Sequence, residues 1–193
     1  MAQAAGSGRV PAGFIHVARA QRAGSRMYSS IPTSEPNEWI CSTQPLASHS
    51  GAAKPVTSQG FVRLPNYFSS ELLTSTKFVI VDRVPMPPLS KLGLAQFAGF
   101  ESADYAGITY LDTFFLKKGH ASEEHLFFHE LIHIIQWGLL GPERFLATYA
   151  DGLEKFGYSD SPLEKMAYGA EAAFVQSPIV FDAEKLVARQ LGM

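Results

Sequence analysis

The sequence predicts an α+β fold in which a small, mainly antiparallel sheet packs on a helical half. Short runs rich in β-branched and aromatic residues fall within residues 61–117, whereas the apolar spacing over residues 122–190 is helical. With 193 residues, of which 46% are hydrophobic and 18% charged, the chain is long and apolar enough to bury a core. We therefore expect an ordinary globular domain rather than a disordered chain.

Residues 1–60 are expected to be a flexible or irregular N-terminal arm that precedes a domain at residues 61–193. Residues 1–34 contain four arginines and no acidic residue, and their Ala- and Ser-rich composition is typical of a transit peptide. Prolines recur between residues 30 and 60, which favours an extended linker. We expect a cytoplasmic protein, or a mitochondrial one if residues 1–28 are a targeting segment.

Composition excludes several classes of function. The net charge of −2 provides no basic field, so we expect no nucleic-acid partner. The sequence contains no run of about 18 apolar residues, so we expect no transmembrane segment. A single cysteine, Cys41, excludes both an intramolecular disulfide framework and a zinc site built from several cysteines.

The elements of the predicted sheet follow in order along the chain. Residues 66–75 are expected to form a short helix before the first main strand. Residues 77–83 are rich in β-branched residues and predict a buried strand, which three prolines between residues 85 and 88 bring to an end. Residues 107–117 are rich in Thr, Tyr, Phe and Ile and predict a strand or hairpin entered through Gly107.

The helical half begins with the most informative segment, residues 122–141. Ser122 is a suitable N-cap, and the acidic residues that follow it complement the helix dipole. Gly138 or Gly141 is expected to end this helix, and Pro142 is placed to begin the next one. The last predicted helix, near the C-terminus, is amphipathic and is expected to pack on the core.

An HExxH motif, His129-Glu130-Leu131-Ile132-His133, lies inside this segment. Two histidines at positions i and i+4 project from one face of a helix, one turn apart, and can bind a single Zn²⁺. Glu130 lies beside such a metal ion, where it can take a proton from the attacking water and pass it to a leaving amine. The motif therefore predicts zinc ligands at His129 and His133 and a general base at Glu130.

A catalytic zinc usually has three protein ligands, and no histidine follows His133 in the sequence. Residues 160–176 predict a helix capped by Ser161, and Glu164 and Glu171 lie on one face of it. Either carboxylate is a candidate for the third ligand. Glu164 also has an interpretation without metal, because Ser161-Pro-Leu-Glu164 fits the spacing of a capping box.

HELIH and the downstream PLEKMAY together resemble the gluzincin zinc metallopeptidases, particularly small bacterial-type proteins with HELxHxxQW and PLExxAY. The resemblance covers roughly residues 61–176. It implies a minimal zincin-like fold, a peptide or protein substrate, hydrolysis by a zinc-activated water, and Glu164 as the third ligand. Many gluzincins have an Asp that orients a ligand histidine where this chain has Tyr168. Three other carboxylates are candidates for that role: Asp112, Asp151 and Asp160.

Other polar side chains are candidates for contact with the site or with a substrate, and for Gln136 a packing or hydrogen-bonding role is an equal alternative. Gln136 lies two turns from His129 on the ligand face, and Tyr168 offers a phenol that can stabilise an oxyanion. Tyr149 and Tyr158 are alternatives for the phenol. Residues 107–117 are expected to supply an edge strand on which an extended peptide can pair.

Two alternatives to a peptidase remain open. The first is a non-catalytic zinc-binding structural or protein-interaction domain, which a closed site with four protein ligands would favour. The second is an interaction domain without metal, which Glu164 held in its capping box and distant from both histidines would favour.

Overall fold

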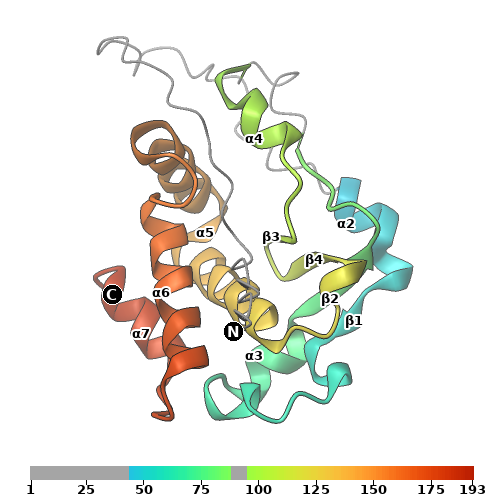
Figure 1. Ribbon diagram of the computed structural model, residues 1–193, viewed down its shortest axis with the longest axis vertical. Coiled ribbons are helices and arrows are strands. Elements are labelled where there is room, and N and C mark those ends of the chain that lie inside the picture. Colours follow the sequence, from blue (N-terminus) through green and yellow to red (C-terminus); the bar gives the residue numbers. More distant parts are fainter. Residues whose placement is uncertain (1–43, 88–94) are drawn as a thin grey trace, which may run out of the picture. The chain divides into compact units, whose positions relative to one another are not determined.

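The computed structural model describes residues 44–87 and 95–193 and shows a four-stranded mixed sheet together with helices (Figure 1). The predicted α+β fold class is confirmed. The candidate targeting segment at residues 1–28, and Cys41, lie outside the described residues.

The sheet contains the strands β1 (Lys54–Pro55), β2 (Lys77–Val81), β3 (Gly107–Tyr110) and β4 (Thr113–Lys117), in the spatial order β1-β2-β4-β3. The outer pairs, β1 with β2 and β3 with β4, are antiparallel, as expected for most of the sheet. The central pair, β2 with β4, is parallel. A parallel pair needs a crossover connection, and the chain between β2 and the β3–β4 hairpin is long enough to provide it.

The α-helices are α2 (Gln44–His49), α3 (Ser70–Ser75), α4 (Ala98–Ser102), α5 (Glu124–Phe156), α6 (Pro162–Gln176) and α7 (Ala183–Gln190). Short 3₁₀ turns lie at Ser50–Ala52, Val56–Gln59, Leu64–Asn66, Ala95–Phe97 and Lys118–His120. The predicted hairpin and the predicted C-terminal helix are both present. Helix α7 packs on the core through Ala183 and Val187, which are fully buried.

Residues 44–60 contain more structure than the expected irregular arm. They form α2, two 3₁₀ turns and the edge strand β1. Val56 is buried in the main hydrophobic cluster, and the ring of His49 meets the edge of Phe115 at 5.4 Å. This part of the chain therefore packs on the same core as the residues that follow it.

Helix α5 consists of two helical segments that meet at Gly141. Gly141 has φ of +71°, a left-handed conformation that glycine adopts without strain, and Pro142 begins the second segment. Of the two predicted end points, Gly141 is therefore the one used. Gly157, with φ of +77°, ends the second segment, and the chain then turns into α6. This turn allows α6 to pack back against the first segment of α5.

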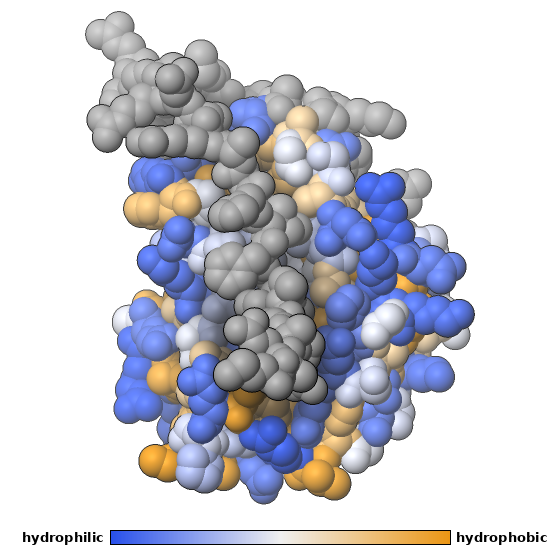
Figure 2. Space-filling model, in the orientation of Figure 1, coloured by the Kyte–Doolittle hydropathy of each residue, from blue (hydrophilic) through white to orange (hydrophobic). Residues whose placement is uncertain are grey.

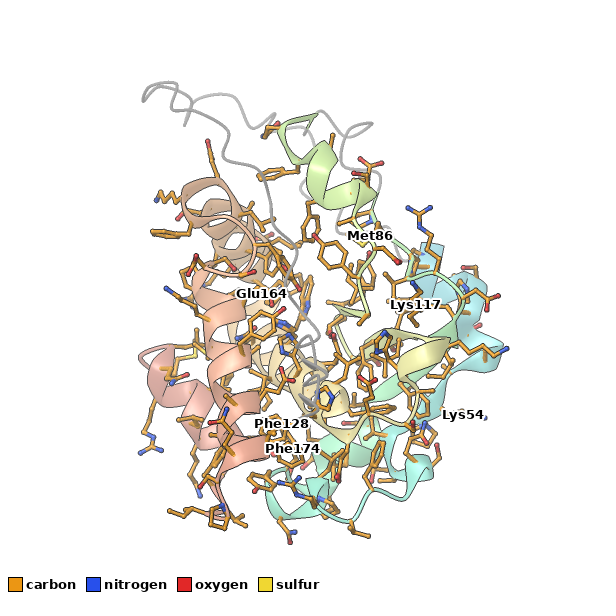
Figure 3. The ribbon with its side chains drawn as sticks, in the orientation of Figure 1. Lys54, Met86, Lys117, Phe128, Glu164 and Phe174 are labelled. Carbon is orange, nitrogen blue, oxygen red and sulfur yellow. The ribbon has the colours of Figure 1, made fainter. Side chains whose placement is uncertain are left out.

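The core is built around the first segment of α5, in which every residue from Phe127 to Trp137 is buried. On one side Phe127 meets the sheet residues Phe78 and Phe114 edge-on, at 5.1 and 5.3 Å. On another side Phe128 stacks on Phe174 of α6 at 4.4 Å (Figure 3). Because both the sheet and α6 cover this segment, the polar side chains of the HExxH motif are shielded from solvent.

Within residues 44–87 and 95–193, no helix combines the length and the apolar character needed to cross a membrane. On the face shown in Figure 2, hydrophilic residues cover most of the surface outside the grey atoms, and hydrophobic residues appear singly or in small groups.

Candidate metal centre

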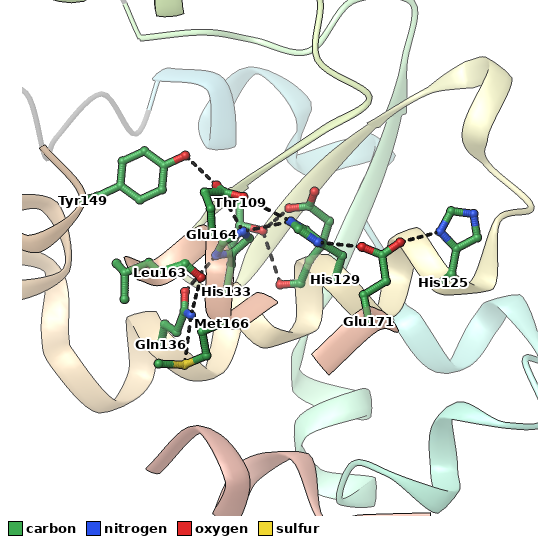
Figure 4. A network of polar contacts seen from close by, with 11 residues as sticks. Thr109, His125, His129, His133, Gln136, Tyr149, Leu163, Glu164, Met166 and Glu171 are labelled. Atoms are coloured by element: carbon green, nitrogen blue, oxygen red, sulfur yellow. Dashed lines mark hydrogen bonds and ion pairs between the residues drawn. The ribbon is translucent and has the colours of Figure 1, made fainter. Parts of the chain in front are cut away.

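Helices α5 and α6 bring three potential metal ligands together in the interior. His129 and His133 lie one turn apart on α5, and their Nε2 atoms are 3.2 Å apart (Figure 4). Glu164 lies in the first turn of α6, with its Oε2 atom 3.5 Å from His129 Nε2 and its Oε1 atom 3.5 Å from His133 Nε2. One potential ligand atom from each of the three residues lies within 4.8 Å of the others, which is close enough to hold a metal ion.

The hydrogen bonds around the cluster leave these atoms available to a cation. The Nδ1 atom of each histidine has a partner of its own, so the two Nε2 atoms face the centre of the cluster. Glu164 Oε2 is buried and has no hydrogen-bond partner. A buried carboxylate oxygen without a partner is costly, and a bound cation would remove that cost. The donor set of two imidazoles and one carboxylate therefore fits a divalent metal ion.

The carboxylates around His129 favour its protonated form. Burial disfavours the charged form of His129, but the nearby carboxylates of Glu164 and Glu171 raise the pKa of this histidine to about 10. Nearby histidines also keep the pKa of Glu164 below its usual value, although burial opposes that shift. A metal ion that binds Nε2 of His129 must displace this proton, because metal ligands bind in their deprotonated form.

The capping box proposed for Glu164 does not form. Ser161 is the N-cap residue of α6, but its backbone N–H donates to the carbonyl of Tyr158 at 3.2 Å. The Glu164 side chain turns away from the cap, and the Tyr149 hydroxyl donates to its Oε1 atom at 2.7 Å. Glu164 is only 2% exposed, so its carboxylate belongs to the buried cluster.

Glu171, the other candidate for the third ligand, lies on the opposite side of His129 from Glu164. Its Oε2 atom accepts a hydrogen bond from His129 Nδ1 at 3.0 Å, and its Oε1 atom pairs with His125 Nδ1 at 2.8 Å (Figure 4). Burial opposes ionisation, but these histidines lower the pKa of Glu171, so it stays charged at neutral pH. A carboxylate on Nδ1 holds the ring so that Nε2 faces a metal.

The three aspartates considered for this supporting role are elsewhere. Each pairs with a lysine at the surface: Asp112 with Lys77, Asp151 with Lys155, and Asp160 with Lys165. The expectation was wrong because it was confined to aspartates, whereas the longer side chain of Glu171 reaches His129 from the third turn of α6.

Replacing Glu171 with Ala is expected to weaken metal binding about 10–100-fold, because His129 loses the acceptor that orients its ring. Competition with a chromophoric zinc chelator measures this affinity. Glu154→Ala, which removes an exposed carboxylate from α5, is the matched control and should leave the affinity unchanged. Equal affinities for the two variants would show that Glu171 does not support the site.

Gln136 supports the second histidine rather than a substrate. It is fully buried, and its Oε1 atom accepts a hydrogen bond from His133 Nδ1 at 2.8 Å. Its Nε2 atom donates to the carbonyl of Leu163 at 3.0 Å, which ties α5 to the start of α6. Of the roles considered for Gln136, the structure therefore shows a hydrogen-bonding contact with His133, a residue of the site.

Glu130, the predicted base, points towards the edge strand β3. Its Oε2 atom accepts a hydrogen bond from the Thr109 hydroxyl at 2.6 Å, and burial raises its pKa. Its carboxylate packs so closely on Gly107 that a Cβ atom there would collide with it. Sequence reasoning identified Gly107 only as the entrance to a strand and missed Thr109, because no local pattern relates β3 to α5.

The phenols divide into two groups. Tyr168 packs its ring against His129, with centroids 4.6 Å apart, and is not among the residues that line the cavity described below. Tyr149 and Tyr158 do line that cavity, and burial raises the pKa of both well above the usual value. Tyr149 and Tyr158 therefore remain protonated donors, and they are better placed than Tyr168 to meet a bound molecule.

A cavity of about 140 Å³ opens beside the cluster. Glu130, His133 and Glu164 contribute to its wall, together with the whole of β3. A molecule in this cavity would therefore contact the base, one histidine and the third potential ligand. These three residues come from α5 and α6, so the cavity exists only when the two helices pack together.

Neither a protein-family model nor a curated protein nor a solved structure matches this chain. What the cluster does is therefore inferred from its own residues.

Proposed function

We propose that this protein is a zinc-dependent metallopeptidase in which His129, His133 and Glu164 hold the metal and Glu130 is the general base. The observation that carries the proposal is the buried cluster of three potential ligands, in which Glu164 Oε2 has no hydrogen-bond partner, adjoining a cavity that Glu130 also lines. Two histidines and one carboxylate are a donor set typical of catalytic zinc. The resemblance of HELIH and PLEKMAY to the gluzincins agrees with this proposal.

Zinc in such a site supplies Lewis acidity, which polarises a scissile carbonyl and makes water a better nucleophile. Glu130 accepts the proton of the attacking water and delivers it to the leaving amine. The hydrogen bond from Thr109 holds one oxygen of this carboxylate and leaves the other to act on the proton. Burial raises the pKa of Glu130 towards the range in which a carboxylate is an effective proton carrier.

The peptide is held by β3. This strand is at the end of the described sheet, and all four of its residues line the cavity. An extended peptide that adds to this edge would run past Glu130 and His133. Tyr158 offers a phenolic donor to the carbonyl oxygen on which negative charge develops, whereas the Tyr149 hydroxyl already donates to Glu164.

A purely structural zinc site is less well supported. Structural zinc is usually held by four protein ligands, whereas the cluster contains three among the residues that the structure describes. The cavity beside the cluster leaves room for water and substrate at the remaining position.

The test is reversible removal of the metal. We expect the purified chain to contain close to one zinc per molecule and to cleave a denatured protein substrate. A chelator should abolish cleavage, and added zinc should restore it. Stoichiometric zinc without hydrolysis of any peptide would support the structural alternative, whereas a chain that binds no zinc would overturn the proposal.

A further inference from the structure

The cavity beside the metal cluster is walled by aromatic rings in continuous contact. Trp137 stacks on Phe145 at 4.0 Å, and Phe145 stacks on Tyr149 at 5.7 Å. Tyr149 meets the edge of Phe100 at 6.0 Å. Phe100, Tyr105 and Tyr158 contact one another at 5.0–5.9 Å. These six rings come from α4, α5 and the loops that follow them, and all of them line the cavity.

The remaining wall is mainly apolar, with contributions from Ile108, Leu146 and Leu153. Among the described residues that line the cavity there is no Lys, Arg or Asp. The ionisable acid and imidazole groups are those of Glu130, His133 and Glu164, which the proposed mechanism uses. Beyond these three groups, the cavity therefore offers a ligand apolar contact and phenol hydroxyls.

The size of the cavity suits one large side chain. An engineered apolar cavity of roughly 150 Å³ binds benzene, and this cavity measures about 140 Å³. Aromatic pairs in offset or edge-on contact are favourable beyond their buried area, so a further ring would be well accommodated.

We propose that the cavity binds an aromatic or large aliphatic side chain of the peptide substrate, next to the bond that is cleaved. This inference rests on the proposed peptidase function and specifies its substrate class. A peptide paired with β3 would direct one side chain between Ile108 and the aromatic wall, while its backbone lies against Glu130. Substrate peptides without such a side chain at this position leave the cavity unfilled and bind weakly.

A binding experiment tests the cavity without requiring catalysis. The chain contains two tryptophans, so Trp39→Phe leaves Trp137, in the cavity wall, as the only indole fluorophore. N-acetyl amides of Phe, Leu, Ala and Lys are titrated into this protein with and without zinc, and Trp137 emission is recorded. We expect the Phe and Leu amides to bind at least about 10-fold more tightly than the Ala amide. Tighter binding of the Lys amide than of the Phe and Leu amides would overturn the inference, because it would indicate that the aromatic rings bind a cation.

Two substitutions on the same helix make a matched pair. Ala150 lines the cavity, and Ala147, one turn before it, is exposed and does not. Ala150→Phe should fill the cavity and weaken binding of the Phe amide at least about 10-fold, whereas Ala147→Phe should have no effect. Circular dichroism checks that both variants fold, and Ala150→Leu replaces Ala150→Phe if the larger side chain prevents folding. Equal affinity of the Ala150→Phe and Ala147→Phe proteins for the Phe amide would overturn the inference.

Cleavage of a peptide library separates this inference from the function on which it rests. Zinc-dependent cleavage without preference for aromatic or large aliphatic residues would overturn the inference and leave the peptidase standing. A chain that binds the Phe amide but neither binds zinc nor cleaves peptides would support the chemistry of the cavity and overturn the peptidase. Cleavage beside Phe or Leu, lost in Ala150→Phe, would support both.

Discussion

Replacing Glu130 with Gln is expected to lower peptide hydrolysis about 10²–10⁴-fold while leaving zinc bound. Gln has nearly the shape of Glu and can still accept the hydrogen bond from Thr109, so the local packing should persist. It cannot accept a proton from water at neutral pH, so the general base is lost. Glu130 is not one of the three potential ligands, and its removal should therefore not release the metal.

Three measurements on the same preparations decide the role of Glu130. Elemental analysis gives the zinc content, a quenched-peptide assay gives kcat/KM, and thermal unfolding shows whether the fold is intact. Glu143→Gln, which changes an exposed carboxylate on α5 in the same way, should match the wild type in all three. Hydrolysis at the wild-type rate by pure Glu130→Gln protein would contradict the assignment of Glu130 as the base.

Replacing Glu164 with Ala is expected to remove the metal and, with it, the activity. His129 and His133 alone provide two ligands, fewer than the three that catalytic zinc sites use. The substitution also leaves the buried Tyr149 hydroxyl without its acceptor, which costs about 1–3 kcal/mol of folding stability. The free energy of unfolding of the wild-type protein should rise by about 2.7 kcal/mol when the free zinc concentration is 100 times the dissociation constant. That of the Glu164→Ala variant should hardly change.

Zinc titrations followed by thermal unfolding measure this difference directly. His133→Ala should behave like Glu164→Ala, because it removes another potential ligand of the cluster. Glu154→Ala is the control for loss of a carboxylate and should unfold like the wild type with and without zinc. Retention of zinc in Glu164→Ala together with its complete loss in Glu171→Ala would move the third ligand to Glu171.

Most elements whose signals are local lie where they were predicted, although the N-cap of α5 is Glu123 rather than Ser122 and the helix expected over residues 66–75 begins at Ser70. Residues 77–83 and 107–117 contain β-branched and aromatic residues that favour strands, and Ser161-Pro162 begins α6 where expected. The relation of β2 to β4 was not predicted, because the direction of a strand pair depends on the path of the connecting chain rather than on either strand.

The supporting residues of the site were the least predictable. Most of them depend on a contact between segments that are distant in the chain: Gly107 and Thr109 with Glu130, and Glu171 with His129. Gln136 contacts His133 within one helix, but its second bond, to Leu163, joins α5 to α6. Gln136 and Glu171 were noticed as polar residues on the ligand face, but their partners were not. Periodicity identifies the face of a helix on which a residue lies, and it does not identify what packs against that face.

The sequence by itself determined the positions of His129, Glu130 and His133 relative to one another, because four residues make about one turn of an α-helix. It also offered Glu164 and Glu171, which lie on one face of α6, as candidates for a third ligand. Only the tertiary structure shows that Glu164 joins the two histidines in one cluster. The left-handed glycines Gly141 and Gly157 turn the chain so that α6 packs on α5. That packing places Glu164 beside the two Nε2 atoms and Glu171 beside Nδ1 of His129. The difference depends on how the two helices pack together, which the spacing of residues along one helix does not determine.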